Sequence, residues 1–191
     1  TRKTTCCQTR AFHKFLRRNG VLETDLDRIV PTVLQRRLAS IPQHLPWEQV
    51  RKLVESVGTD HPQDKRDRAI LLLIASLGLR NREVRTLELS HIAWRQAEIR
   101  LPRTKSRRER VLPMPQETGE ALEDYVLHGR PALDLPHVFL RHRAPLGILK
   151  TSAAIVRIVR RHLHRAGLEA PGRIGAHLLR HSLATRMVNS D

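Results

Sequence analysis

The order of apolar and polar positions along the chain predicts a mostly helical protein. The densest apolar run, AILLLIASLGL at 69–79, is long enough for a buried helix, and Gly78 is a typical place for it to stop. Apolar residues recur at helical spacing in further segments, which are 9–19, 46–57, 115–129, 151–167 and the last stretch from 175. Two strand-like segments, 97–101 and 110–114, flank a polar turn and predict an antiparallel hairpin, and 137–141 is a further short extended piece. The expected fold class is therefore mainly α with a small antiparallel β-hairpin.

The segment that directly follows the apolar run carries polar side chains that packing in a core does not require. A second short helix is predicted at 82–89, with Asn81 as its N-cap. Arg80 precedes it, beside a helix N-terminus whose free N–H groups favour anions. A guanidinium there can bind a phosphate oxygen, or it can form a structural salt bridge with Glu83. The sequence alone leaves both interpretations open.

Proline residues divide the chain near positions 41–46. Pro31, Pro42 and Pro46 interrupt a loose stretch, and Pro46 begins a new helix. We therefore expect a short N-terminal unit at 1–42 and a larger unit at 43–191.

The charge of the chain indicates a polyanionic partner. Its 35 Lys and Arg against 19 Asp and Glu give a net charge of +16, which favours nucleic acid over an anionic membrane surface. No apolar run reaches the roughly 18 residues of a membrane span, and no secretory signal is present, so we expect a cytoplasmic or nucleoid location. Cys6 and Cys7 are adjacent, which is not the pattern of a disulfide framework or a zinc site.

Two basic segments could bind such a polyanionic partner. The hairpin turn has a single acid, Glu109, and one lysine, Lys105, which unlike an arginine can donate a proton to a leaving oxygen. The other cations of this turn are Arg100, Arg103, Arg107, Arg108 and Arg110. On the helix predicted at 151–167, the residues outside the apolar stripe are Arg157, Arg160, Arg161 and His164. Each segment faces DNA or is simply solvated.

The last helix carries a third group of polar residues. His177 and Arg180 are three apart and share a face, and His181 follows one turn after His177. Leu179 and Leu183 point to the other side, toward the core. An imidazole beside a guanidinium can hold a phosphoryl group, although histidines that only pack or cap are more common.

These segments together resemble the catalytic domain of the tyrosine recombinases, the phage-integrase family. The motifs are GLRxxE from Gly78, a hairpin with a central lysine, and HxLRH followed by AT from His177, in this order. The stretch RAFHKFLRRNG is similar to the end of that family's N-terminal core-binding domain. The resemblance implies that 1–42 is the remnant of this domain with its linker and that 43–191 is the catalytic domain.

The resemblance also implies a role for each motif residue. Arg80 and Arg180 would bind the scissile phosphate, Lys105 would protonate the departing 5′-oxygen, and His177 would hydrogen-bond the phosphate and assist proton transfer. Glu83 and His181 would support them. The DNA backbone would be contacted by Arg103, Arg107, Arg108 and Arg110. The family's reaction uses no metal and no cofactor, its partner is double-stranded DNA, and its working form is a homotetramer on two DNA sites.

One departure concerns the nucleophile, which in the family is a tyrosine that follows the HxLRH helix. The only tyrosine here is Tyr125, which precedes that helix and has core spacing with Ala121 and Leu122. We therefore expect a recombinase fragment that lacks the attacking tyrosine and is monomeric. A naturally truncated derivative that binds DNA without cutting it is the alternative, and an unrelated RNA-binding module is the third hypothesis.

Overall fold

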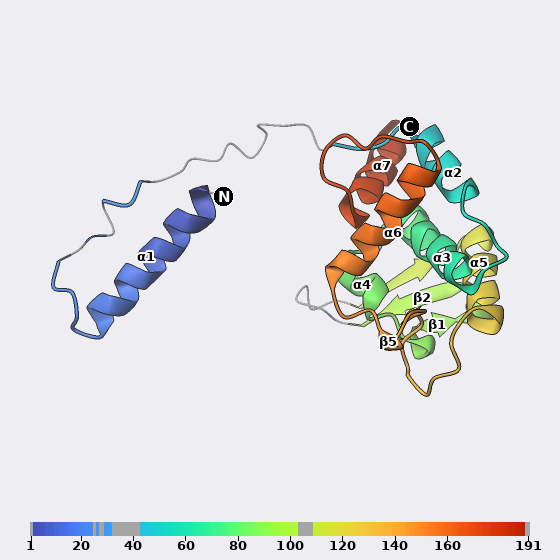
Figure 1. The fold of residues 1–191 in the computed structure, drawn as a ribbon, viewed down its shortest axis with the longest axis horizontal. Helices are drawn as coiled ribbons and strands as arrows, with labels where there is room; N and C mark the ends of the chain where they lie inside the picture. The colour runs from blue at the N-terminus through green and yellow to red at the C-terminus, as the bar shows by residue number, and fades with distance from the viewer. Residues whose placement is uncertain (1, 25, 27–28, 32–42, 103–108, 190–191) are drawn as a thin grey trace. The chain divides into compact units, whose positions relative to one another are not determined.

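The computed structural model describes residues 2–24, 26, 29–31, 43–102 and 109–189. It divides the chain into two compact units, Thr1–Ile41 and Pro42–Asp191 (Figure 1).

The first unit is built on one helix, α1, at Arg2–Arg18. It begins earlier than the predicted segment 9–19, because no proline or glycine interrupts residues 2–8. Gly20 follows its end with a φ of 70°, a backbone conformation that suits glycine. The apolar residues Phe12 and Phe15 are 58% and 60% exposed, so this apolar side of α1 is uncovered in the described part of the unit.

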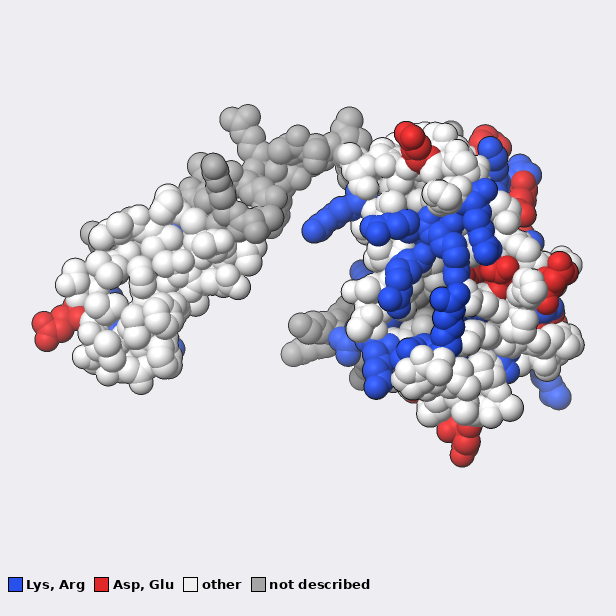
Figure 2. Space-filling view, viewed as in Figure 1, with Lys and Arg blue, Asp and Glu red and all other residues white. Residues whose placement is uncertain are grey.

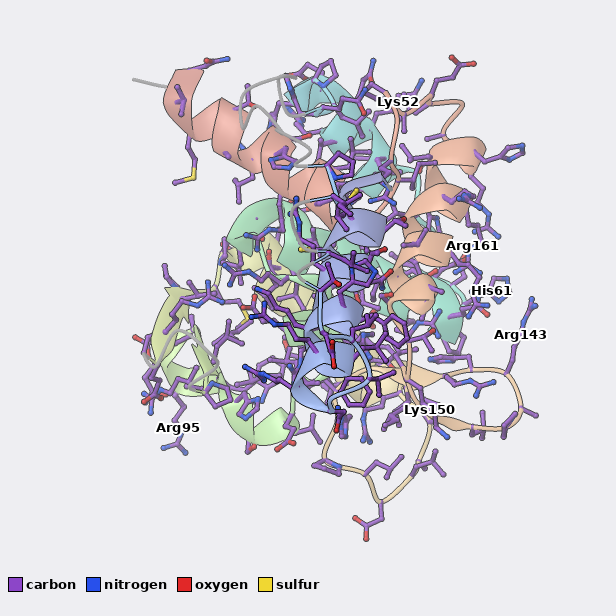
Figure 3. The ribbon with its side chains drawn as sticks, turned by 90° about the vertical axis from the view of Figure 1, so that its left-hand side faces the viewer. Lys52, His61, Arg95, Arg143, Lys150 and Arg161 are labelled. Atoms are coloured by element: carbon purple, nitrogen blue, oxygen red, sulfur yellow. The ribbon has the colours of Figure 1, made fainter. Side chains whose placement is uncertain are left out.

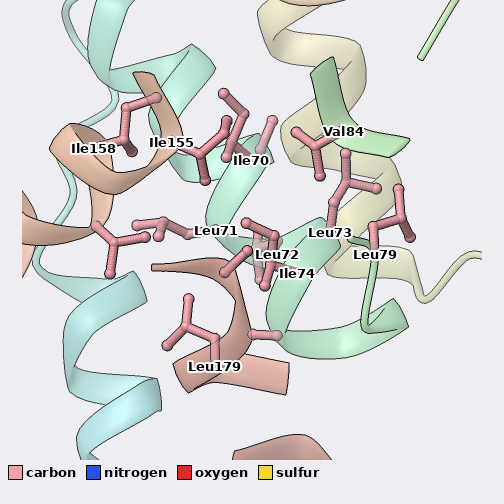
Figure 4. Close-up of a cluster of buried hydrophobic side chains, with 14 of the residues drawn as sticks. Ile70, Leu71, Leu72, Leu73, Ile74, Leu79, Val84, Ile155, Ile158 and Leu179 are labelled. Atoms are coloured by element: carbon pink, nitrogen blue, oxygen red, sulfur yellow. The ribbon is translucent and has the colours of Figure 1, made fainter. Parts of the chain in front are cut away.

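The second unit is a bundle of helices around α3, at Pro62–Leu77. Proline at its first position and glycine after its last one define its ends, since Gly78 has a φ of 62° and its N–H bonds to the carbonyl of Ile74. Every residue of 69–75 is buried (Figure 4). α3 packs against α2 at Trp47–Glu55, α5 at Gln116–His128 and α7 at Ala176–Asn189 (Figure 1).

The remaining helix of the bundle, α6 at Ser152–Arg165, buries its apolar stripe against the same core. Ile155 and Ile158 of this stripe lie near Ile70 and Leu71 of α3 (Figure 4). The mostly helical fold predicted from the sequence is confirmed.

A small antiparallel sheet completes the unit. Its strands are β1 at Ile92–Ala93, β2 at Glu98–Leu101 and β3 at Arg110–Pro113, in the order β1-β2-β3. Ile99 pairs with Ile92 on one side and with Leu112 on the other. β2 and β3 are the predicted hairpin, whereas β1 was not predicted because it has only two residues. A separate pair joins β4 at Leu140–Arg141 to β5 at Gly147–Ile148.

The prediction for the helix after α3 was wrong in two respects. α4 spans only Asn81–Arg85, and a separate 3-10 turn at Leu89–His91 follows it. Its N-cap is Arg80 rather than Asn81, whose side-chain oxygen accepts a bond from Arg85 Nε at 3.0 Å and whose Nδ2 donates to the Ser152 carbonyl at 3.1 Å. Asparagine is a common N-cap, but here its side chain binds Arg85 of the same helix and the Ser152 carbonyl at the start of α6.

Candidate functional site

The candidate site forms where the end of α3, the start of α4 and helix α7 meet. The Gly78 carbonyl accepts a hydrogen bond from the Arg180 guanidinium, which joins two segments that are 102 residues apart. Leu79 and Leu179, the neighbours of these residues in sequence, are fully buried in the core (Figure 4). The core therefore fixes the backbone on both sides of the contact. This rigid backbone in turn limits the positions of the polar side chains next to it.

The carboxylate of Glu83 organises the cations of this site. Its Oε2 accepts the backbone N–H of Arg80 at 2.7 Å, and its Oε1 accepts Arg80 Nη1 at 3.0 Å and Arg110 Nη2 at 2.5 Å. The Glu83 side chain is only 7% exposed, while those of Arg80 and Arg110 are 61% and 39% exposed. One buried acid thus holds two arginines whose outer N–H groups still reach solvent.

The charges around Glu83 do not balance. Burial lowers the pKa of Arg180, and the nearby positive charges of Arg80 and Arg110 lower it further, against the opposing effect of Glu83. Burial alone would raise the pKa of Glu83, but the Arg80 N–H and the two guanidinium groups hold it below its usual range. Three guanidinium groups therefore crowd around one carboxylate, and a bound anion would relieve this repulsion.

Two histidines extend the site along α7. His177 and His181 lie one turn apart, with ring centroids 6.5 Å from each other in an edge-on arrangement. His177 is exposed and His181 is half-buried. No hydrogen bond joins either ring to the arginines among the residues that the structure describes. A side chain at Gly175 would approach the His177 ring to 3.2 Å, so glycine there leaves room for the imidazole.

The sequence-predicted residues are thus partly assembled. Arg80, Glu83, Arg110 and Arg180 come together. Both interpretations of Arg80 are compatible, since its side chain remains 61% exposed while it forms the salt bridge to Glu83. The predicted general acid Lys105 and the predicted DNA contacts Arg103, Arg107 and Arg108 lie outside the described residues.

Tyr125 lies in the core, as predicted. It is completely buried, its ring stacks on Phe139 with centroids 5.5 Å apart, and its hydroxyl accepts the backbone N–H of Leu140 at 3.2 Å. Burial raises the pKa of this hydroxyl, which disfavours the phenolate that would act as a nucleophile. Packing rather than attack on a substrate therefore accounts for this residue.

A buried ion-pair cluster around Asp67 was missed by the sequence interpretation. Asp67 Oδ1 accepts Arg66 Nε at 2.9 Å and Nη2 at 2.7 Å, and Oδ2 accepts His162 Nε2 at 2.9 Å and the guanidinium of Arg161. Asp67 and His162 are fully buried. The sequence signal for this cluster is the charged pair Arg66–Asp67, which stands directly before the apolar run at 69–79. The partners of this pair on α6 are about 95 residues away, so its spacing in the sequence does not reveal them.

This cluster is also the place where acidic and histidine ligand atoms gather. Asp64, Asp67 and His162 bring theirs within 4.8 Å of one another in the described part of the chain. The guanidinium groups already supply positive charge there, since Arg161 binds Asp67 and Arg165 Nη1 binds Asp64 at 3.2 Å. The ion pairs explain the cluster without a metal ion.

None of the described helices has the length and apolar character to cross a membrane.

Comparison with known proteins gives a consistent result. The model of the phage integrase family matches residues 43–191. The integrase/recombinase y4rF of Sinorhizobium fredii is 45% identical over 188 residues, which are 98% of this chain and 44% of that protein. The integrase/recombinase y4gC of the same organism is 36% identical over 151 residues, or 78% of this chain and 77% of that protein. Tyrosine recombinase XerD of Mycobacterium tuberculosis is 33% identical, over 94% of this chain and 58% of that protein.

Solved structures show the same fold. The XerH site-specific recombinase bound to a palindromic difH substrate, a post-cleavage complex, has a TM-score of 0.69 at 22% identity, over 86% of this chain and 47% of that one. A lambda integrase dimer bound to a COC′ core site has a TM-score of 0.67 at 15% identity, over 96% of this chain and 64% of that one.

The chain spans only 44% of the length of y4rF, so that relative extends beyond the region that matches this chain. The family model nevertheless covers all of 43–191, and the relatives named above agree with it. The chain belongs to the phage integrase family.

Proposed function

We propose that the chain is part of a site-specific DNA recombinase or integrase of the tyrosine type, and that residues 43–191 hold the phosphate at which the DNA strand is cut. The convergence of Arg80, Arg110 and Arg180 around the single carboxylate of Glu83 carries this proposal. The excess positive charge, the open N–H groups of Arg80 and the fixed backbone suit a tetrahedral phosphodiester.

The proposed roles follow from the chemistry of each group. Arg80 and Arg180 donate to the non-bridging oxygens and stabilise the charge that they gain in the transition state. Glu83 keeps Arg80 and Arg110 in place and does not touch the phosphate. His177, one turn before His181 on α7, hydrogen-bonds the phosphate, and Lys105 supplies the proton to the 5′-oxygen.

In this reaction a tyrosine hydroxyl attacks the phosphorus and forms a 3′-phosphotyrosine, while the bond to the 5′-oxygen breaks and that oxygen takes a proton. Rejoining is the reverse step, so no metal and no external energy source is needed. Because Tyr125 is buried, these residues by themselves hold the phosphate but do not attack it. For the whole protein we propose double-stranded DNA as substrate and a homotetramer on two DNA sites as the working assembly.

The alternative is a DNA-binding derivative that never cuts DNA, and the burial of the only tyrosine favours it for these residues alone. Both versions require the phosphate site. An SDS-stable adduct on a nicked duplex that traps the covalent intermediate would contradict the alternative, and it would show that these residues supply a nucleophile of their own.

Fluorescence anisotropy with a labelled duplex DNA tests the proposal. The logarithm of the binding constant should fall steeply and linearly with the logarithm of salt concentration, because Arg–phosphate contacts release counterions. The double variant Arg80→Gln/Arg180→Gln should have a shallower slope. Lys52→Gln/Arg95→Gln is the control, because it also removes two positive charges and both residues are exposed, one on α2 and one on the turn between β1 and β2 (Figure 3). Stronger binding to duplex RNA than to DNA, or an unchanged slope in the double variant, would overturn the proposal.

A further inference from the structure

Two side chains of α4 join the proposed phosphate site to the start of α6. Arg85 Nη1 donates to the carbonyls of Leu149 at 3.1 Å and Lys150 at 2.7 Å, which lie just before α6. Asn81 Nδ2 donates to the Ser152 carbonyl at 3.1 Å, and Arg85 Nε donates to Asn81 Oδ1 at 3.0 Å. We call these four hydrogen bonds the α4–α6 bracket, and three of them join residues that are 64 to 71 positions apart.

Arg85 takes part in the bracket through its geometry and not through an ion pair. Basic side chains gather on the face of the second unit that Figure 2 shows, but Arg85 binds neutral oxygens. No carboxylate binds it among the residues that the structure describes. The N–H groups of a guanidinium are fixed in one plane, so a single side chain can hold several oxygens at set positions. Arg85 therefore links two backbone segments.

The place of Asn81 in α4 also indicates a bracket. Asparagine is most favourable as an N-cap, yet Asn81 is the first residue of α4 and its N-cap is Arg80. Departures from a local preference are expected where function requires them. This departure places the Asn81 amide between Arg85 and the Ser152 carbonyl. The residue next to the proposed phosphate-binding Arg80 is thereby tied to α6.

The helix α4 depends on such contacts because it is short. It has five residues, and helices of fewer than about 12 residues are marginal on their own in water. Val84 is fully buried and holds one side of α4 against the core, and its N–H bonds to the Arg80 carbonyl at 3.0 Å. The bracket holds another side. The direction in which the Arg80 side chain leaves the backbone therefore depends on both contacts.

The other end of the bracket is rigid. Ile155 and Ile158 bury one side of α6 in the core beside α3 (Figure 4). Directly after α3, the Gly78 carbonyl binds the guanidinium of Arg180. The bracket thus ties Arg80 to the same core that positions Arg180. Two guanidinium groups that bind one phosphate need a constant separation, and this arrangement provides it.

We propose that Asn81 and Arg85 are positioning residues of strand transfer. They touch neither the phosphate nor the reacting atoms, and they hold Arg80 where it can bind the transition state. This inference rests on the proposed function. Loss of the bracket loosens Arg80 without removing it. Because a misplacement of about 1 Å can slow a reaction about 100-fold, we expect strand joining to slow by about 10- to 100-fold, with little change in DNA affinity.

The test follows strand joining on a nicked duplex with p-nitrophenyl phosphate on the 3′ side of the nick and a free 5′ hydroxyl. The protein concentration is raised until the rate is constant, which separates the rate constant from the dissociation constant. Circular dichroism establishes whether each variant is folded under the assay conditions.

The variants remove the bracket from either side. Asn81→Ala removes two of its hydrogen bonds without a change in charge, and alanine is a good helix former. Arg85→Gln removes the guanidinium together with one charge. Its matched control is Arg82→Gln, which removes one charge from an exposed residue of the same helix.

The proposal expects Asn81→Ala to join strands about 10- to 100-fold more slowly at the dissociation constant of the wild type. Arg85→Gln should be slowed similarly relative to Arg82→Gln, at the same dissociation constant as this control. The double variant Asn81→Ala/Arg85→Gln should be slowed by less than the product of the two single effects, because both side chains belong to one bracket.

Four results would overturn the proposal. They are rate constants equal to those of the wild type and the control, a loss of affinity at an unchanged rate constant, full multiplication of the two effects in the double variant, and slowing that circular dichroism traces to unfolding. The last would show that the bracket supports the fold alone.

The proposed function fails separately. If the wild-type chain accelerates joining and Arg80→Gln abolishes the acceleration, while Asn81→Ala and Arg85→Gln have no effect of their own, only the positioning role is wrong. If the wild-type chain does not accelerate joining, the proposed function fails and the positioning role fails with it.

Discussion

Replacing Asp67 by asparagine should destabilise the second unit severely. The substitution keeps the shape but removes the carboxylate charge to which Arg66, Arg161 and His162 all bind, and Asp67 itself has no exposed surface. Breaking a buried ion pair costs about 3–5 kcal/mol, because an uncompensated charge stays behind. Arg161 is 30% exposed and can be rehydrated, whereas Arg66 cannot, so we expect the lower part of that range, about 3–4 kcal/mol.

Urea denaturation at pH 7, monitored by circular dichroism, measures this loss in the free energy of unfolding. In a thermal melt, the melting temperature should fall by roughly 6–16 °C. Glu123→Gln removes an exposed carboxylate of α5 instead and should change the free energy of unfolding by less than about 0.5 kcal/mol. Equal stability of Asp67→Asn and the wild type would refute the argument that this ion-pair cluster supports the fold.

The same contribution should depend on pH. Burial alone would raise the pKa of Asp67, but the hydrogen bond from His162 and the charges of Arg66 and Arg161 hold it below its usual range. A carboxyl with a lowered folded-state pKa contributes stability above its unfolded pKa of about 3.9 and loses it as pH falls through the folded value. The difference between the wild type and Asp67→Asn should thus be full at pH 6 and shrink below about pH 4.

Three further substitutions separate structural from chemical roles. Gly78→Ala should cost about 1–2 kcal/mol in urea denaturation, because the φ of 62° is strained for alanine and the new Cβ would lie 3.3 Å from Leu183; an unchanged midpoint would contradict this. Tyr125→Phe should cost about 1 kcal/mol through the lost bond to the Leu140 N–H and leave DNA affinity unchanged; weaker binding in anisotropy would speak against a pure core role. Glu83→Gln should slow strand joining more than it weakens DNA binding, since the arginines remain but are less well positioned; the reverse ratio would argue that Glu83 has no positioning role.

Much of the fold could be predicted because its signals are local. The apolar run of α3 and the stop at Gly78 depend on residues a few positions apart, and the structure has both. The hairpin β2–β3 was likewise visible from two short apolar segments around a polar turn. The error at Asn81 arose where a tertiary partner, the Ser152 carbonyl, overrides a local preference.

The candidate site could be predicted only in part. Arg80 and Glu83 are three residues apart, so their pairing was a local alternative, and the structure has it. The contact of Arg110 with Glu83 spans 27 residues and that of Arg180 with Gly78 spans 102, and no spacing in the sequence specifies such partners. The buried Asp67 cluster escaped for the same reason.

The central claim, that this chain holds a DNA phosphate ready for transfer, can be measured without an attacking tyrosine. A nicked duplex carries p-nitrophenyl phosphate at its 3′ end and a free hydroxyl at the adjoining 5′ end. In the joining step the 5′-oxygen forms the bond to phosphorus, gives up its proton and displaces p-nitrophenolate. Release of p-nitrophenol and the joined strand are followed together.

We predict that the chain accelerates joining, that Arg80→Gln or Arg180→Gln abolishes the acceleration, and that Tyr125→Phe retains it. Joining at the rate of the protein-free duplex, or acceleration that survives both arginine substitutions, would contradict the claim that these arginines form the phosphate site.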